Sequence, residues 1–344
     1  MAARAFITGI DSTRLSDAER TFLRDADPWG LILFRRNVQS PEQIRRLSGA
    51  FRDVVGRDDA PVLIDQEGGR VQRLAPPHWP AYPPGAAYGA LFEIDRDLGL
   101  RAAWLGARLI AADLHALGIT VNCVPLGDMP APGANAVIGD RAYGTTAAQV
   151  AAIAQALAAG LIDGGVLPVL KHLPGHGRAN ADSHERLPVV GVDRVTLQNS
   201  DFAAFRALAK LPFGMTAHVV YTAIDPVEPA TTSPAVIGDV IRKWIGFDGA
   251  LMSDDISMGA LSGTIAERTR AAVAAGCDLV LHCNGKGDEM RQVAGEAPLL
   301  DGDAARRTIA ALAARRNPSP FDVAAARAEF SAMMARISDS VAVS

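Results

Sequence analysis

The stretch VLPVLKHLPGHGRANADSH, Val166 to His184, carries the clearest signal for the fold. It begins with a short apolar run, Val166–Leu170, of the kind found in strands that are buried on both faces. A polar segment rich in histidine, glycine and proline follows at once. The stretch therefore predicts a buried strand of a parallel sheet with chemically useful side chains after its carboxyl end.

Seven further apolar runs recur along the chain at wide intervals. They are Ala5–Ile10, Leu31–Phe34, Pro61–Ile64, Ile119–Val124, Phe213–Thr216, Ala250–Met252 and Cys277–Leu281. Between them, apolar residues at helical spacing predict helices over Pro41–Val55 (with Ser40 as N-cap), Leu98–Leu117, Ala147–Gly160, Leu197–Leu208, Val236–Trp244 and Ile265–Ala275. Eight strands alternating with helices predict a (β/α)₈ barrel of the TIM type. A doubly wound open sheet is the alternative, but no dinucleotide-binding fingerprint supports it.

The chain of 344 residues is expected to form one domain. Division by about 150 residues per domain suggests two, yet α/β barrels routinely exceed about 200 residues as one unit. We predict a single catalytic barrel over residues 1–344, with a C-terminal helix over about 321–337 packed outside it.

Composition and charge exclude several classes of protein. Hydrophobic residues make up 49 % of the chain, which is too many for a disordered protein. The net charge of −4 without a basic run argues against a nucleic-acid partner. Neither a membrane-spanning run nor a signal peptide is recognisable, and three cysteines are too few for a disulfide framework. We therefore expect a cytoplasmic, monomeric protein that acts on a small molecule, without a membrane partner.

Polar clusters follow most of the predicted strands. They contain Asp65–Arg70, Lys171-His172, Ala217-His218, Ser253–Asp255 and His282. In (β/α)₈ barrels the catalytic residues lie at this carboxyl end of the strands. Three long connections, Ala75–Ala90, Gly127–Thr146 and Pro174–Pro188, are expected to be functional loops at the same end.

The segment Lys171–His184 allows three chemical hypotheses. The first is a metal site, although the spacing matches no recognised zinc pattern; its possible ligands are His172, His176, Asp182 and His184. The second is a Schiff base on Lys171, although the polar neighbours argue against the desolvation that this requires. The third makes Asp182 an orienting carboxylate and His184 a proton-transferring imidazole, with Asp254 as the nucleophile. A loop held only by local hydrogen bonds is the structural alternative.

Several motifs occur along the chain in a distinctive order. They are Gly30–Phe34 (GLILF), Asp65–Arg73 (DQEGGRVQR), Ile138–Arg141 (IGDR), Lys171–Gly177 (KHLPGHG), Asp182–His184 (DSH), Met215–His218 (MTAH) and Ser253–Met258 (SDDISM). Together they resemble the pattern of the family 3 glycoside hydrolases, and most closely that of their single-domain bacterial β-N-acetylhexosaminidases. Leu173 and Ile256 stand where the family pattern has Phe and Leu, and both are apolar exchanges that leave the chemistry unchanged.

The resemblance implies a retaining mechanism with Asp254 as the nucleophile, which forms a covalent glycosyl-enzyme that water then hydrolyses. It implies that His184 is the acid/base and that Asp182 orients it. A free imidazole has a pKa of about 6.5, so it can both donate and accept a proton near neutral pH. Asp255 is expected to serve the structure.

The resemblance also implies the substrate contacts, which are Asp65, Arg73, Arg141, Lys171 and His172. Asp65 would accept hydrogen bonds from sugar hydroxyls, and Lys171 would donate to sugar oxygens. Arg70 is expected to be structural. For His218 and Asp128, a supporting position is at least as well motivated as direct contact with the substrate.

The activity implied is removal of a terminal β-linked N-acetylglucosamine from 1,6-anhydro-N-acetylmuramic acid muropeptides in peptidoglycan recycling, with no metal or organic cofactor. The family's β-glucosidases typically take their acid/base from a second domain, whereas here the Asp182–His184 pair supplies the proton locally. Alternatives are a β-N-acetylglucosaminide phosphorylase and another β-glycosidase of the family. From different classes, a metal-dependent barrel hydrolase and an inactive sugar-binding protein remain open.

Overall fold

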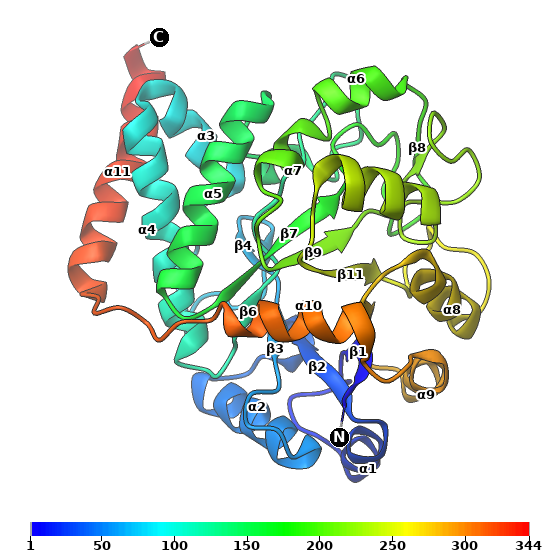
Figure 1. Cartoon of the computed structure of the whole chain (residues 1–344). Helices are drawn as coiled ribbons and strands as arrows, with labels where there is room; N and C mark the ends of the chain where they lie inside the picture. The colour runs from blue at the N-terminus through cyan, green and yellow to red at the C-terminus, as the bar shows by residue number, and fades with distance from the viewer. Residues whose placement is uncertain (1, 344) are drawn as a thin grey trace.

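Eight parallel strands close into a barrel at the centre of the molecule (Figure 1). The computed structural model describes residues 2–343, so the two end residues of the predicted 1–344 domain lie outside the described part. The barrel strands are β1 (Arg4–Thr8), β2 (Pro28–Leu33), β3 (Val62–Ile64), β6 (Val121–Asn122), β7 (Leu167–Leu173), β9 (Phe213–Thr216), β11 (Ala250–Asp255) and β12 (Leu279–His282). They follow one another around the barrel in this order, each pair is parallel, and β12 pairs with β1. The predicted barrel is therefore confirmed.

Helices follow the strands and surround the barrel (Figure 1). They are α1 (Asp17–Ala26), α2 (Pro41–Val55), α3 (Gly85–Ile94), α4 (Arg96–His115), α5 (Ala147–Asp163), α6 (Arg194–Asn199), α7 (Ala203–Ala207), the π-helix η3 (Val236–Ile245), α8 (Ile265–Ala275) and α9 (Gly287–Glu296). Helices α2 and α8 have the predicted bounds because local capping fixes them: Ser40 accepts a hydrogen bond from the Gln43 N–H, and Thr264 caps α8 in the same way. Among residues 2–343, no helix combines the length and hydrophobicity needed to cross a membrane.

Apolar side chains fill the barrel and the layer between strands and helices. Buried inward-facing residues include Ile7, Ile32, Leu63, Val169 and Leu281. Near them, Trp29 and Phe213 pack edge to face with ring centroids 5.5 Å apart. Helix α10 (Gly302–Ala313) adds Ala311 to this cluster, and the segment before α10 pairs with the start of β1. The amino end of the barrel is thus closed by apolar groups, which leaves the carboxyl end for polar chemistry.

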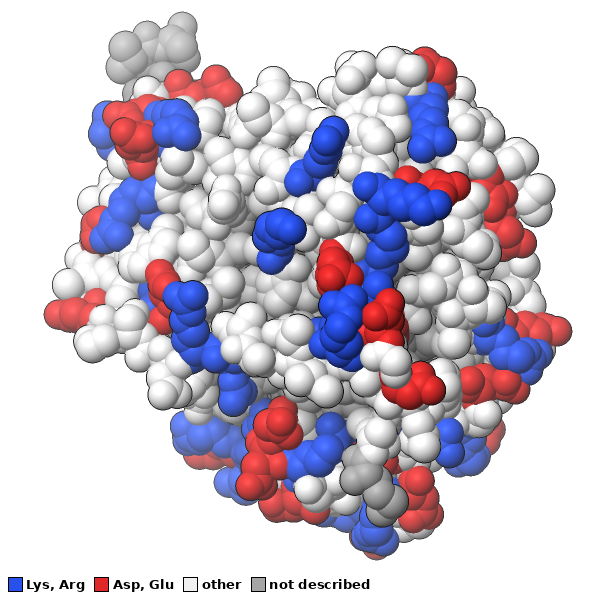
Figure 2. Space-filling view, viewed as in Figure 1, with Lys and Arg blue, Asp and Glu red and all other residues white. Residues whose placement is uncertain are grey.

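Charged side chains on the outside of the barrel do not gather into a surface of one sign. Figure 2 shows basic and acidic side chains intermixed over the face that Figure 1 presents. On α10, Arg306 pairs with Asp248 at 2.9 Å and Arg307 pairs with Asp278 at 3.0 Å. The Arg306–Asp248 pair is exposed and adds little stability, about 0–1 kcal/mol, whereas Arg307 and Asp278 are largely buried.

The last helix, α11 (Val323–Val343), lies beside α4 and α3 on the outside of the barrel (Figure 1). Arg101 of α4 binds Glu329 of α11 through two hydrogen bonds of 2.8 and 2.9 Å. Phe330 packs against Tyr88 of α3 with ring centroids 6.4 Å apart. Helix α11 therefore extends the apolar packing on the outer side of α3 and α4.

The single helix predicted over Leu197–Leu208 is wrong, because the chain forms α6 and α7 with a break between them. Ser200 Oγ donates to the Thr196 carbonyl at 2.6 Å, and the Asp201 carboxylate accepts from Arg178 at 2.9 Å. Side-chain hydrogen bonds of this kind compete with the backbone bonds of a helix. Arg178 comes from the loop after β7, so the local apolar spacing could not reveal the break.

Two other expectations also need correction. The predicted loop Ala75–Ala90 already contains the start of α3, at Gly85. Glycine is needed there because the Arg141 carbonyl oxygen lies 2.1 Å from the position that a Cβ would occupy. The helix predicted over Val236–Trp244 winds as a π-helix, and apolar spacing does not distinguish the two windings.

Short elements shape the loops at the carboxyl end of the barrel. Strands β4 (Gln66–Gly68) and β5 (Val71–Gln72) form an antiparallel pair after β3, and β8 (Val189–Val190) pairs in parallel with β10 (Val220–Tyr221). Two single turns of 3₁₀-helix, η1 (Arg35–Asn37) and η2 (Gly139–Arg141), follow β2 and β6. These elements fix the directions of the loops that carry the predicted site residues.

Candidate active site

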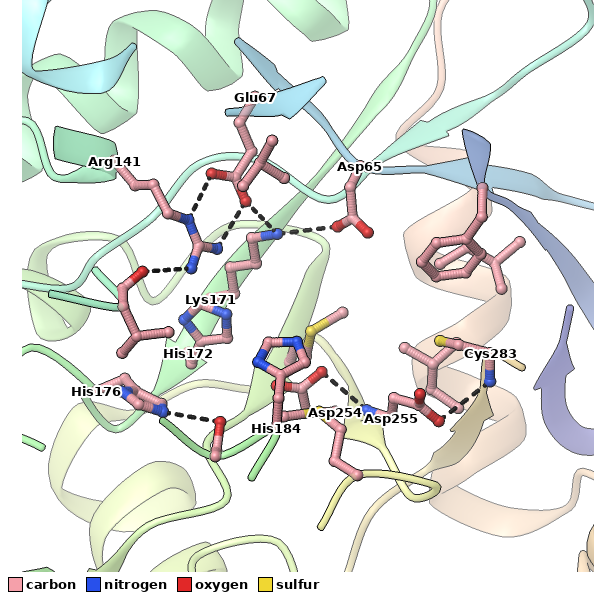
Figure 3. A pocket seen from close by; sticks show the side chains of 18 of the residues that line it. Asp65, Glu67, Arg141, Lys171, His172, His176, His184, Asp254, Asp255 and Cys283 are labelled. Atoms are coloured by element: carbon pink, nitrogen blue, oxygen red, sulfur yellow. Dashed lines mark hydrogen bonds and ion pairs between the residues drawn. The ribbon is translucent and has the colours of Figure 1, made fainter. Parts of the chain in front are cut away.

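A cavity of about 390 Å³ opens at the carboxyl ends of the barrel strands (Figure 3). Its lining includes all eight residues that the sequence predicts for the site: Asp65, Arg73, Arg141, Lys171, His172, Asp182, His184 and Asp254. The carboxylates in the lining number five, and so do the lysine and arginine side chains. Because these formal charges balance, the cavity suits an uncharged polar molecule of the size of a sugar.

A buried cluster of ion pairs forms one wall of the cavity. Lys171 Nζ lies 3.0 Å from Asp65 Oδ1 and 2.7 Å from Glu67 Oε1. Arg73 donates to the second oxygen of Asp65 at 3.0 Å, and Arg141 binds Glu67 through two hydrogen bonds of 2.9 and 2.8 Å. The Lys171 side chain is only 3 % exposed. The cluster ties together segments that follow β3 and β6 and the end of β7.

The charges in this cluster hold one another in the ionised state. Burial by itself would raise the pKa of Asp65, but Lys171 and Arg73 keep that pKa well below its ordinary value. The pKa of Glu67 is also lowered: burial opposes ionisation, but Lys171 and Arg141 outweigh it. Burial would lower the pKa of Lys171, but the two carboxylates raise it above its ordinary value. A protonated Lys171 that is paired with two carboxylates is a hydrogen-bond donor and not a nucleophile, which argues against the Schiff-base hypothesis.

Replacing Lys171 with methionine is expected to destabilise the fold by about 3–5 kcal/mol at neutral pH, because two buried carboxylates would lose a shared cation. In the wild type the lowered pKa values of Asp65 and Glu67 contribute stability above about pH 4, where the unfolded carboxyls are ionised. That contribution is lost as the pH falls through the folded-state values. The difference in unfolding free energy between the variant and the wild type should therefore become smaller on acidification.

Urea unfolding of both proteins at pH 7.5 and pH 3 measures this difference. Lys210→Met, at an exposed lysine, is the matched control and should leave stability nearly unchanged. An equal difference in unfolding free energy at the two pH values would contradict the ionised state of the cluster.

The sequence analysis missed Glu67 as a site residue. Glu67 lies two residues after Asp65 along an extended segment, so the two side chains share one face. Both carboxylates reach Lys171. This alternation was visible in the motif DQEGGR and was the available signal.

Asp128 and His218 occupy supporting positions. Asp128 is fully buried and accepts hydrogen bonds from His172 Nδ1 at 2.6 Å and from the backbone N–H of His176 at 2.6 Å. Burial would raise the pKa of Asp128, but His172 lowers it. His218 is also fully buried, and its Nε2 donates to the Asp255 carbonyl at 3.0 Å. Both residues hold their neighbours in place.

The adjacent carboxylates of β11 have different surroundings. Asp255 uses both oxygens within the structure: it accepts from the N–H groups of Ser257 and Cys283 at 3.0 and 3.1 Å and from Ser257 Oγ at 2.7 Å. Asp254 accepts one hydrogen bond, from the Asp255 N–H at 2.8 Å, and takes part in no ion pair within residues 2–343. Burial would raise the pKa of Asp254, but His218, His172, the Asp255 N–H and Lys171 lower it. Asp254 therefore lines the cavity as an available, ionised carboxylate.

Asp182 and His184 form a hydrogen-bonded pair that lines the cavity, and Figure 3 shows His184 beside it. His184 Nδ1–H donates to Asp182 Oδ1 at 2.7 Å, and the His184 backbone N–H donates to the same oxygen at 2.9 Å. Burial would raise the pKa of Asp182, but these bonds lower it. The His184 side chain is 67 % exposed, and the pairing of Nδ1 fixes Nε2 as the nitrogen available to a bound molecule.

The geometry gives the metal hypothesis no support. Within residues 2–343, the histidine, cysteine, aspartate and glutamate side chains make no group of three or more arranged to hold a metal ion. The Nδ1 atoms of His172 and His184 are bonded to carboxylates instead.

A (β/α)₈ barrel with carboxylates and imidazoles around a sugar-sized cavity at its carboxyl end suits a glycoside hydrolase, and sequence comparison shows this class. The family model described as "Glycosyl hydrolase family 3 N terminal domain" matches residues 5–313. The chain belongs to glycosyl hydrolase family 3.

Individual relatives agree with this assignment. A curated β-hexosaminidase from Alkalilimnicola ehrlichii is 42 % identical over 284 residues, which cover 80 % of this chain and 79 % of that protein. The crystal structure of NagZ from Neisseria gonorrhoeae in complex with N-trifluoroacetyl-D-glucosamine superposes with a TM-score of 0.84 at 32 % identity and 98 % coverage of both chains. The β-N-acetylhexosaminidase from Beutenbergia cavernae gives a TM-score of 0.77 at 30 % identity, covering 90 % of this chain and 96 % of that one.

Proposed function

We propose that this glycoside hydrolase is a retaining exo-β-N-acetylglucosaminidase, which removes terminal β-linked N-acetylglucosamine from 1,6-anhydro-N-acetylmuramic acid muropeptides during peptidoglycan recycling. The observation that carries the proposal is that Asp254 and the Asp182–His184 pair line one cavity. The printed names of the relatives supply the sugar, since they are β-hexosaminidases. The muropeptide follows from the motif resemblance.

In the first step Asp254 attacks the anomeric carbon of the terminal sugar. The bond between that carbon and the leaving oxygen breaks, and His184 Nε2–H donates its proton to this oxygen. The Asp182 carboxylate stabilises the imidazolium that precedes proton transfer, because it accepts the Nδ1–H bond. The product of this step is a glycosyl ester on Asp254.

In the second step water attacks the same carbon from the face that the aglycone has left. His184, now neutral, takes the proton from water, and the ester bond to Asp254 breaks. Two displacements restore the starting configuration at the anomeric carbon. A neutral imidazole also avoids placing a second carboxylate charge next to the nucleophile.

The cluster around Lys171 binds the sugar away from the bond that breaks. Asp65 offers acceptors to sugar hydroxyls, whereas Arg73, Arg141 and Lys171 offer donors. His172 presents Nε2, because its Nδ1 is bonded to Asp128. These side chains already hold one another in position, so little order has to be created when the sugar binds.

Hydrolysis of 4-nitrophenyl N-acetyl-β-D-glucosaminide, followed by proton NMR, tests the proposal. We expect N-acetylglucosamine to appear first as the β-anomer, because two displacements at one carbon retain configuration. First release of the α-anomer would contradict a covalent intermediate on Asp254. A synthetic N-acetylglucosaminyl-1,6-anhydro-N-acetylmuramic acid disaccharide then tests the natural bond.

The same reaction with and without phosphate separates hydrolysis from phosphorolysis. Phosphorolysis is the second candidate because an imidazole acid/base would not repel an incoming phosphate, whereas a carboxylate would. Free N-acetylglucosamine as the product in both conditions supports the hydrolase. N-acetylglucosamine 1-phosphate as the main product would identify a phosphorylase instead.

A further inference from the structure

The tripeptide Asp182-Ser183-His184 is held from the side of β11 by backbone hydrogen bonds. The Ala260 N–H donates to the Ser183 carbonyl at 3.1 Å, and the Gly259 N–H donates to the His184 carbonyl at 3.1 Å. Both donors belong to the loop that follows Asp254. These bonds locate the backbone of the tripeptide but leave its side chains free to turn.

A buried imidazole holds the same tripeptide from the side of β7. His176 Nε2 lies 3.1 Å from Ser183 Oγ, and Figure 3 draws this contact as the dashed line that starts at His176. Both side chains are buried, with His176 at 3 % and Ser183 at 3 % exposure. The contact is therefore shielded from water, and a hydrogen bond in such a buried environment is stronger than one at the surface.

The protonation of His176 can be assigned from its surroundings. Burial lowers the pKa of His176 to about 4, so the ring is neutral at neutral pH. Its Nδ1 is buried and has no hydrogen-bond partner in the part of the chain that the structure describes. A proton on Nδ1 would be a buried donor without an acceptor, which is costly. The favoured tautomer carries its proton on Nε2 and donates to Ser183 Oγ.

His176 is itself attached to a buried, hydrogen-bonded part of the site. Its backbone N–H donates to Asp128 Oδ1 at 2.6 Å, while Asp128 Oδ2 accepts from His172 Nδ1 at 2.6 Å. His172 belongs to β7, and Asp128 is fully buried. A continuous chain of hydrogen bonds thus runs from the barrel wall through Asp128 and His176 to Ser183, which lies between the members of the acid/base pair.

We propose that His176 is a positioning residue for catalysis, which sets the orientation of His184 through the side chain of Ser183. The inference rests on the proposed function, because it takes His184 as the acid/base. His176 acts through the hydrogen bond to Ser183 and does not exchange a proton with the substrate. Without that bond, the Asp182–His184 pair keeps its internal hydrogen bonds but loses its fixed direction toward the cavity.

A double-mutant cycle tests this role. His176→Leu is made in the wild type and in the His184→Ala background, and kcat/KM is measured on an N-acetyl-β-glucosaminide with a poor leaving group. We expect a loss of about 10- to 100-fold in the wild type, the range expected when a reacting group is displaced by a fraction of an ångström to one ångström. In the His184→Ala background the same change should cost less than about 2-fold, because the residue through which it acts is gone.

Ser183→Ala provides a second and smaller perturbation that breaks the same bond from the other side. It should show the same dependence on His184, whereas Ser262→Ala, at an exposed serine, should leave kcat/KM unchanged. His176→Gln keeps an N–H donor near the position of Nε2 and should recover part of the lost activity. Recovery by glutamine but not by leucine supports the hydrogen bond.

The possible outcomes separate the two proposals. Equal losses from His176→Leu and Ser183→Ala in both backgrounds would overturn the positioning role, because damage to the cavity in general does not depend on His184. Wild-type activity of His184→Ala alone would instead refute the proposed function. Losses of kcat/KM that occur only in the background with an intact His184 support both proposals.

Discussion

Asp254→Ala is expected to lower kcat/KM for N-acetyl-β-glucosaminides by about 10⁴-fold or more, because it removes the proposed nucleophile, which would form the covalent intermediate. Asp254 is the carboxylate of β11 that is available to a substrate, whereas Asp255 is bonded to Ser257 and Cys283. Its lowered pKa keeps it ionised throughout the neutral range. The kinetics of the purified variant with 4-nitrophenyl N-acetyl-β-D-glucosaminide measure the loss.

Two controls make this result specific to the nucleophile. Asp58→Ala, at an exposed aspartate, should keep wild-type kinetics. The melting temperature of Asp254→Ala should stay near that of the wild type, since Asp254 accepts one hydrogen bond and takes part in no ion pair within the described residues. A folded Asp254→Ala variant with more than about a tenth of the wild-type activity would refute the mechanism.

His184→Ala is expected to lower kcat/KM by about 10²- to 10⁴-fold on substrates with poor leaving groups, the usual contribution of a general acid/base. The loss should be smaller on a dinitrophenyl glycoside, because this leaving group departs without a proton. With that substrate the glycosyl-enzyme should accumulate, since water still needs a base. Intact-protein mass spectrometry during turnover would detect the added N-acetylglucosaminyl mass.

The accumulated intermediate gives a further check on His184. Azide attacks without losing a proton, so added azide should accelerate turnover of His184→Ala and form a glycosyl azide. His78→Ala, at an exposed histidine, serves as the matched control and should show neither effect. A loss that is independent of the leaving group and unaffected by azide would contradict the assignment of His184 as the acid/base.

Local sequence signals predicted the parts of this fold that local physics decides. Runs such as Val166–Leu170 are buried on both faces of a parallel barrel, so their hydrophobicity is continuous and recognisable. Helix α2 has its predicted bounds because Ser40 and Gly56 cap it within the same segment. The break between α6 and α7 was not predictable, since it depends on Arg178 from another loop.

The candidate site also contains residues that the sequence predicted and a residue that it did not. The motif resemblance predicted Asp254, His184 and Asp182 as catalytic residues, and the structure places all three in the lining of one cavity. Glu67 was missed because its importance comes from Arg141 and Lys171, which approach it from other strands. The alternation of Asp65 and Glu67 places both side chains on one face, but it does not show that these two cations come within reach.

The sequence by itself determined the barrel, the positions of the polar clusters after its strands and the pairing of Asp182 with His184 two residues later. Each of these follows from hydrophobic periodicity or from contacts between neighbours along the chain. Only the tertiary structure decided that Asp254 is available while Asp255 is occupied, and that His176 reaches Ser183. The physical reason is that a buried polar group depends on partners that the folded barrel brings from distant segments, and burial makes each partner decisive.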